Sequence, residues 1–565
     1  MQKHWKYIDT DQNTVKALQN DLQIHPIFCK LLVQRGIADY DTAKQYFRPK
    51  LEDLHDPFLM SGMEKAVKRI QIAIDKEEKI LIYGDYDVDG TTSVALMYSF
   101  LSGIHGHLDY YIPDRYKEGY GVSYQGIEYA KQKGVSLIIT LDCGIRANSQ
   151  IDFANNEDID VIICDHHIPD STLPDAYAVL DPKQVDCNYP YQELSGCGVG
   201  FKLAQGICQK LNLPDENWLE LLDLVVISIA ADIVPIRGEN RILAHFGLQQ
   251  LNRTERIGLR ALASKSGKTF PLSISDIVFG IAPIVNAAGR LADAEQAVRL
   301  LLANTKQGAA DLSNILEARN KLRREFDERT SREAKEQFEQ MPDKEERKSI
   351  VLFHPHWHKG VVGITASRMV EAYYRPTIIL TESQGKVVGS ARSVRHFNVH
   401  EAIEQCSDLL INFGGHSHAA GLTMYPENVP TFQDRFEAIV STSIEEGALI
   451  PEVSVNAELK LEDLNAGFWK ILKQFAPFGP KNRNPVFVSK GVRDAGYTKT
   501  LRGNHLRLAI KQDKSELFYG IAFGMGDLYE QVKTGKAFDI CYSIHENRWK
   551  ERKYLQLMVK DIRFY

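Results

Sequence analysis

Short apolar runs alternate with helical patterns between residues 79 and 235, and this alternation is the strongest constraint on the fold. The four runs are KILIYG, LDYYIP, SLIITLD and DVIICD, and amphipathic stretches such as TTSVALMYSFLSG and SYQGIEYAKQKG separate them. A β-α-β-α order predicts a parallel sheet with helices on both faces. In sheets of this kind, ligands bind beyond the carboxyl ends of the strands.

Acidic and histidine side chains follow three of these predicted strands. In chain order they are Asp85, Asp87, Asp89, Asp142, Asp165, His166 and His167. Clustered carboxylates raise each other's pKa, and keeping all of them ionised requires compensating positive charge. No Lys or Arg lies within residues 80–90, so a divalent cation is the simplest compensation. The alternative is a solvated acidic turn in which an aspartate caps the next helix.

Asp232 lies at the end of the apolar stretch LVVISIAADIVP, where a charge is costly unless it is paired or bound to metal. Carboxylate oxygens suit Mg²⁺ or Mn²⁺, and the two imidazoles shift the preference toward Mn²⁺. The whole set is large enough for two cations. Two metals ~3.5–4 Å apart typically serve phosphoryl transfer to water.

Four motifs, DYDVDG, LDCG, DHH and ADIVP, occur in an order that resembles the DHH phosphoesterase superfamily. GGHSHAAGL (414–422) is similar to the glycine-rich signature of the DHH-associated domain. IPDRYKEGYGVS, LSGCGVGFKLA, NAAGRL and FAPFGPKNRNPVF narrow the resemblance to the bacterial single-strand-specific DNA exonucleases of this superfamily. The resemblance spans residues 50–490.

This resemblance implies roles for individual residues. The implied metal ligands are Asp87, Asp89, Asp142, His166 and Asp232. Asp85 and His167 are implied as catalytic groups beside the metals, and Asp85 could instead be a direct ligand. The implied DNA- and phosphate-binding residues are Arg115, Tyr120, Arg290, Ser390, Arg392 and His416.

Within the last group, Arg115, Ser390 and Arg392 are implied to recognise a 5′-terminal phosphate, and Tyr120 could stack on a terminal base. For each arginine the alternative is a surface ion pair. For His416 the alternative is a tight structural turn.

Composition changes along the chain suggest its domains. Residues 303–348 are highly charged with helical spacing, which indicates a long solvated helix joining two lobes. A second α/β pattern follows, and then short β-rich runs that fit an OB-fold. We therefore expect an α/β protein with the divisions 1–60 (N-terminal extension), 61–302 (parallel-sheet DHH phosphoesterase domain), 303–348 (connecting helix), 349–448 (smaller DHH-associated domain) and 449–565 (OB-like β-barrel).

The net charge of −6 does not fit a generic nucleic-acid binder, but the charge is unevenly distributed. Residues 481–565 hold 17 Lys and Arg against 9 Asp and Glu, which suggests that this end binds a polyanion. The eight cysteines include no CxxC pair, and no run of 18 apolar residues occurs. We therefore expect reduced thiols in a cytoplasmic protein without a membrane span.

The family resemblance implies a 5′→3′ exonuclease that degrades single-stranded DNA to 5′-mononucleotides in DNA repair and recombination. Two divalent cations, Mn²⁺ or Mg²⁺, would serve as cofactors. A helicase and a single-strand-binding protein are further candidate partners. One alternative is a DHH phosphodiesterase for short oligonucleotides or cyclic dinucleotides, and the basic C-terminal module argues against it. The other is a non-catalytic DNA-binding scaffold, and the intact acidic set argues against that.

Overall fold

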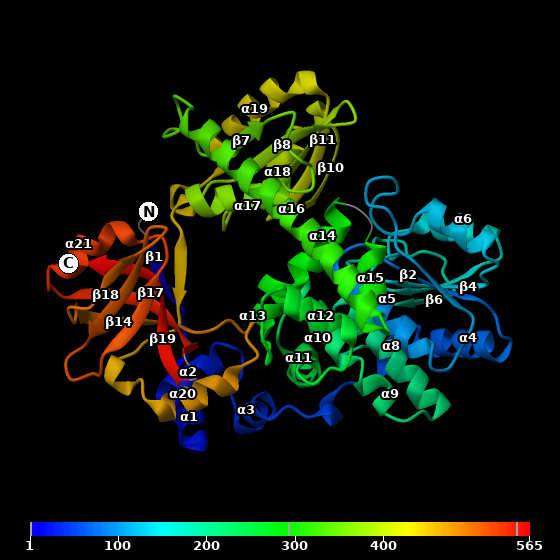
Figure 1. The fold of residues 1–565 in the computed structure, drawn as a ribbon, viewed down its shortest axis with the longest axis horizontal. Coiled ribbons are helices and arrows are strands. Elements are labelled where there is room, and N and C mark those ends of the chain that lie inside the picture. Colours follow the sequence, from blue (N-terminus) through cyan, green and yellow to red (C-terminus); the bar gives the residue numbers. More distant parts are fainter. Residues whose placement is uncertain (1–2, 292–293, 550–551) are drawn as a thin grey trace. The chain divides into compact units, whose positions relative to one another are not determined.

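The computed structural model describes residues 3–291, 294–549 and 552–565. Contacts divide the chain into two units. One unit is built mainly from Ile315–Glu452, and the other mainly from Trp5–Gly289 together with Val453–Tyr565. Both units mix helices and strands, so the predicted α/β class is confirmed (Figure 1). Within the described residues, no helix combines the length and apolar character needed to cross a membrane.

A five-stranded parallel sheet organises the first half of the chain. Its strands have the order β3-β2-β4-β5-β6 and every neighbouring pair is parallel. The bounds are β2 (Ile80–Gly84), β3 (Leu108–Tyr111), β4 (Leu137–Leu141), β5 (Asp160–Cys164) and β6 (Ala178–Leu180). The four predicted runs are all strands, and β6 is an additional edge strand.

Helices cover both faces of this sheet, as the alternation predicts. On one face, residues of α6 (Tyr124–Gln132) and α7 (Asn148–Asn156) share a core with the strands. On the other face, α4 (Met63–Asp75), α5 (Val88–Leu101) and α8 (Gly196–Leu211) pack together. A helical continuation follows, comprising α9 (Glu216–Leu219), α10 (Leu222–Ala231), α11 (Gly238–Leu251), α12 (Ile257–Lys265), α13 (Ile274–Asp276), the π-helix η3 (Ile277–Ile281), α14 (Ala282–Leu291) and α15 (Glu295–Leu301).

The long charged helix expected over 303–348 corresponds to α16 (Lys306–Glu339). The unit that follows contains a sheet of order β10-β11-β9-β8-β7, in which only β7 and β8 are parallel. Its strands are β7 (Ile350–Phe353), β8 (Thr377–Ser383), β9 (Lys386–Arg392), β10 (Leu410–His416) and β11 (Ala419–Met424). Its helices are α17 (Val362–Tyr373), α18 (Val399–Glu404) and α19 (Val429–Ser443).

The C-terminal strands form the expected barrel. Their order is β13-β14-β18-β19-β17-β16-β15, and an extra pairing of β14 with β16 closes the sheet on itself. The bounds are β13 (Ala457–Glu458), β14 (Val486–Asp494), β15 (Lys499–Leu501), β16 (His505–Lys511), β17 (Phe518–Ala522), β18 (Phe538–Trp549) and β19 (Arg552–Phe564). α20 (Ala466–Leu472), the 3₁₀ turn η8 (Lys473–Phe475) and α21 (Tyr529–Lys533) accompany it.

The N-terminal helices share one hydrophobic core with this barrel. α1 (Gln12–Leu22), α2 (Pro26–Val33) and α3 (Tyr40–Phe47) contribute buried side chains to the cluster that also contains the barrel strands. In Figure 1, α1 and α2 (blue) lie beside the orange and red elements of the barrel region. β1 (His4–Tyr7) also pairs with β12 (Glu452–Val455), just ahead of the barrel. The two ends of the chain therefore form one folded body.

Phe28 is fully buried in this shared core, with its ring centroid 4.5 Å from that of Phe468. We expect Phe28→Ala to destabilise the barrel region by about 3–5 kcal/mol, since a large cavity would remain. Urea unfolding followed by tryptophan fluorescence measures the change, with Phe523→Ala, at an exposed barrel position, as the control. Equal stability of the two variants would contradict the shared core.

Candidate metal centre

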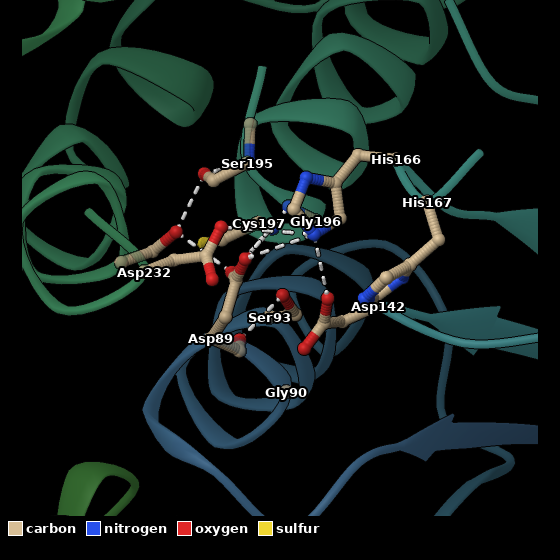
Figure 2. A network of polar contacts seen from close by, with 12 residues as sticks. Asp89, Gly90, Ser93, Asp142, His166, His167, Ser195, Gly196, Cys197 and Asp232 are labelled. Atoms are coloured by element: carbon tan, nitrogen blue, oxygen red, sulfur yellow. Dashed lines mark hydrogen bonds and ion pairs between the residues drawn. The ribbon is translucent and has the colours of Figure 1, made fainter. Parts of the chain in front are cut away.

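Parallel pairing brings the ends of β2, β4 and β5 to one edge of the sheet. Asp89 lies in the first turn of α5 after β2, Asp142 follows β4, and His166 follows β5. Asp232 follows directly on α10. Figure 2 shows the side chains of Asp89, Asp142 and Asp232 gathered around the ring of His166.

The His166 ring is at the centre of this cluster. Its Nε2 lies 3.2 Å from Asp142 Oδ1, 3.7 Å from Asp232 Oδ2 and 3.9 Å from Asp89 Oδ2. Its Nδ1 is 3.0 Å from the carbonyl oxygen of Leu194. A carbonyl can only accept, so Nδ1 carries the proton and Nε2 keeps the lone pair that a metal requires.

Two overlapping ligand groups meet at His166. Ligand atoms of Asp89, His166 and Asp232 lie within 4.8 Å of one another, and so do those of Asp142, His166 and His167. Carboxylate oxygens with imidazole nitrogens form a donor set that fits Mn²⁺ or Mg²⁺. The structure thus brings together four of the five predicted ligands, and it adds His167 to them.

Burial makes this cluster electrostatically unfavourable without added positive charge. Burial and then the neighbouring Asp89 raise the pKa of Asp142 well above its ordinary value. Burial raises the pKa of Asp232 to about 8, with Asp89 as the next cause. All carboxyl groups of the cluster can therefore be ionised together only when a cation is bound among them, which fits a metal site.

Asp87 and Asp85 lie beside the cluster and belong to neither ligand group. Asp87 is the N-cap of α5 and accepts a hydrogen bond from the Gly90 amide at 3.0 Å. Asp85 is buried, and within the described residues its Oδ1 has no hydrogen-bond partner. Burial, followed by the charge of Asp87, raises the pKa of Asp85 to about 8. An unsatisfied buried carboxyl oxygen at this position leaves open a direct contact with a cation.

Asp89 is oriented by the start of α8. Its Oδ2 accepts from the Gly196 amide at 2.8 Å, and its Oδ1 accepts from the Cys197 amide at 2.8 Å and from Ser228 Oγ at 2.7 Å. A helix N-terminus favours a carboxylate. A Cβ on Gly196 would lie 2.6 Å from Asp142 Cβ, so only glycine fits there. The motif LSGCGVG carried no assigned role in the sequence, and this contact gives it one.

Asp165, which the sequence placed in the acidic set without an individual role, supports His167. His167 Nδ1 lies 2.7 Å from Asp165 Oδ1, and its Nε2 lies 3.2 Å from the Tyr120 hydroxyl. Burial opposes ionisation of Asp165, but the hydrogen bond and charge of His167, the Ile145 amide and the charge of His166 together outweigh burial and lower the pKa of Asp165 to about 2. A carboxylate that is already ionised fixes the orientation of the histidine ring.

Arg115 and Tyr120 both lie against Tyr86, which follows Asp85 at the same sheet edge. The Arg115 guanidinium is 5.0 Å from the centre of the Tyr86 ring, and the Tyr86 and Tyr120 ring centroids are 6.3 Å apart. Tyr120 is 56% exposed, so its ring face is available for stacking. Tyr86 was not predicted as a site residue. The only signal for such a role in the sequence is its position between two aspartates of the motif DYDVDG.

The remaining predicted residues lie in the other unit. Arg392 Nη1 donates to Ser390 Oγ at 2.9 Å on β9, and a Cβ on Gly363 would lie 3.0 Å from each side chain. Arg290 Nη1 donates to the Gly360 carbonyl at 3.2 Å. His416 is exposed in the β10–β11 hairpin, paired with Ala419. The serine and arginine of β9 thus form a compact polar pair of the kind that binds phosphate.

Family models match three stretches of the chain. The DHH family N-terminal domain matches residues 79–229, the DHHA1 domain 346–442, and the RecJ OB domain 455–561. Together with the parallel sheet and its acidic edge, these matches define a DHH-superfamily protein with an added OB barrel.

The chain is 40% identical over 565 residues to the single-stranded-DNA-specific exonuclease RecJ of Bacillus subtilis, in a match that covers 99% of this chain and 70% of that protein. RecJ of Thermus thermophilus in complex with Mn²⁺ superimposes with a TM-score of 0.85 at 28% identity, covering 100% of this chain and 80% of that one. Its Mg²⁺ complex gives a TM-score of 0.79 at 27% identity, covering 100% and 78%. The chain belongs to the RecJ family.

Proposed function

We propose that this chain is a metal-dependent exonuclease that degrades single-stranded DNA. The observation that carries the proposal is the cluster of Asp89, Asp142, His166 and Asp232, on a chain that also has an OB barrel. The relatives named RecJ and the Mn²⁺ and Mg²⁺ complexes support the same activity and the same cofactors.

The residues of the cluster would hold two divalent cations, with His167 beside them. When bound, such cations lower the pKa of a water molecule and stabilise negative charge on the phosphate. The amides at the start of α8 hold the Asp89 carboxylate in place as a ligand. The hydrogen bond of His166 Nδ1 to the Leu194 carbonyl leaves Nε2 facing the carboxylates of the cluster. Tyr120 and Arg115 lie at the same edge, where a terminal nucleotide would be bound.

The barrel would supply affinity for the strand. A groove of about 1020 Å³ on it is lined by Trp469, Arg507, Tyr519, Lys553 and Tyr554, among others. The Arg507 guanidinium lies 4.7 Å from the centre of the Tyr519 ring. Cations that alternate with aromatic rings bind single strands with little sequence preference. This groove disfavours an enzyme restricted to cyclic dinucleotides or short oligonucleotides.

A 5′→3′ direction with 5′-mononucleotide products is part of the proposal, with Arg115, Ser390 and Arg392 as the residues that recognise the 5′-phosphate. We expect Arg392→Ala to reduce the preference for a 5′-phosphorylated over a 5′-hydroxyl strand by about tenfold or more, because a charge-assisted pair is lost. Initial rates on the two strands measure this. Arg435→Ala, at a surface ion pair with Asp408, is the control. An unchanged preference would mean that another group binds the end.

The activity is tested by digesting single strands labelled at the 5′ or the 3′ end with Mn²⁺, Mg²⁺ or EDTA. We expect metal-dependent release of labelled mononucleotide first from 5′-labelled strands, and no comparable loss of a duplex. Faster cleavage of a dinucleotide than of a long strand would favour the phosphodiesterase alternative. Binding without cleavage would favour the scaffold alternative. Binding to a helicase and to a single-strand-binding protein, and a cytoplasmic location, remain predictions.

A further inference from the structure

The motif FAPFGPKNRNPVF (475–487) distinguishes this chain in sequence, but neither metal binding nor the barrel groove accounts for it. Part of it lies against the loop that carries Asp232. We name residues 473–482 the docking segment and residues 232–238 the Asp232 loop. Both belong to the same folded unit.

The docking segment contacts the Asp232 loop at Ile236. The Ile236 amide donates to the Pro480 carbonyl at 2.8 Å, and the Ile236 side chain is fully buried. A Cβ on Gly479 would lie 2.5 Å from Ile236 Cγ1. The two segments therefore meet without room for one added methyl group.

Arg241 fixes the same segment to the helix that follows the loop. It lies in the first turns of α11, is only 5% exposed, and stacks on the Tyr46 ring at 3.7 Å. Its guanidinium donates to the carbonyls of Tyr46, Gln474, Phe475 and Ala476 at 3.0–3.3 Å. Five donors in a rigid fork suit such a set of carbonyls. The Asp232 loop therefore lies between α10, whose C-terminal cap is Asp232, and α11, which Arg241 attaches to the docking segment.

The loop itself is strained next to Asp232. Ile233 has a φ of +61°, a left-handed value that is unfavourable for a β-branched residue. Its side chain is 64% exposed, so its own burial does not stabilise this conformation. A strained backbone persists when surrounding contacts determine it. The docking segment supplies the contact at Ile236, and Tyr191 and Asn240 donate to the Pro235 carbonyl of the same loop.

We propose that the docking segment is a positioning element of the metal centre. It holds the Asp232 loop in the conformation that places Asp232 Oδ2 3.7 Å from His166 Nε2. The barrel region therefore contributes to the metal site as well as to strand binding. This inference rests on the proposed role of Asp232 as a ligand, and the test below separates the two.

The test variant is Gly479→Ala, with Gly106→Ala as the control because nothing lies within 4 Å of an added Cβ there. Mn²⁺ alone is titrated into each 565-residue protein by calorimetry. We expect Gly479→Ala to weaken Mn²⁺ binding by about tenfold or more, as displaced supporting groups do in other metal sites. We also expect kcat to fall while KM for a single strand changes little. Strand affinity measured in EDTA should be unchanged.

A second substitution gives a specific rescue. Ile236→Ala removes the Cγ1 atom that the new methyl group would strike, so the double variant should bind Mn²⁺ more tightly than Gly479→Ala alone. Asp232→Asn is measured in parallel. Weakened Mn²⁺ binding in Asp232→Asn, with wild-type binding and kcat in Gly479→Ala, overturns the positioning role alone. Wild-type Mn²⁺ binding in Asp232→Asn removes the ligand assignment on which the inference rests.

Discussion

An Asp142→Asn variant is expected to lose hydrolysis of single-stranded DNA by at least about a thousandfold, which corresponds to about 4 kcal/mol of transition-state stabilisation. Asp142 is buried and lies 3.2 Å from His166 Nε2 in one of the two ligand groups. An amide cannot supply the negative charge that draws a second cation into the cluster. Strand affinity should persist, because the barrel groove lies outside this cluster.

Single-turnover hydrolysis in Mn²⁺, with strand binding measured in EDTA, tests this result. Asp152→Asn is the matched control, since Asp152 is an exposed aspartate on α7 of the same sheet domain. Hydrolysis by Asp142→Asn at the control rate would remove this carboxylate from the mechanism. Loss of strand binding together with hydrolysis would instead indicate a misfolded variant, which a melting curve would reveal.

The metal-free protein is expected to lose stability as the pH rises from 5 to 8. Burial raises the pKa of Asp85 to about 8, whereas this carboxyl ionises near pH 4 in an unfolded chain. Between these values the folded protein holds a proton that the unfolded chain has released. The stabilisation is therefore complete below pH 4 and is lost as the pH approaches 8. Asp232 adds to the effect, but its side chain is 29% exposed and counts for less.

We expect a loss of about 2–4 kcal/mol over this range in EDTA, given about 1.4 kcal/mol per pKa unit and interaction among the carboxyls. Melting curves in EDTA and in Mn²⁺ at several pH values measure it. Mn²⁺ should raise the melting temperature more at pH 8 than at pH 6, because a cation competes with protons for these groups. Asp85→Asn should flatten the EDTA profile. A melting temperature that rises with pH in EDTA would contradict the proposed electrostatics.

Local patterns in the sequence were sufficient for the main elements of the fold. β2, β4 and β5 are short apolar runs bounded by polar residues, and the order of strands and helices determines that their ends share one edge. The charged pattern of α16 likewise indicated a solvated helix. β6 was missed because three residues, Ala178–Leu180, give too little periodicity in a loop rich in proline.

Contacts between distant segments could not be predicted in the same way. The Gly196 amide reaches Asp89 across 107 positions of sequence, and no local pattern specifies that partner. Residues 1–60 were expected only as an N-terminal extension, and no local pattern indicated that their helices would share a core with the barrel. Asp165 is the first residue of the motif DHH, yet its support of His167 depends on side-chain orientation.

The central claim is that the cluster around His166 holds two cations. Its most direct test is anomalous scattering at the manganese absorption edge from crystals of this protein grown with Mn²⁺. We predict two manganese peaks among Asp89, Asp142, His166 and Asp232. Manganese bound elsewhere, or no peak at this cluster, would contradict the account.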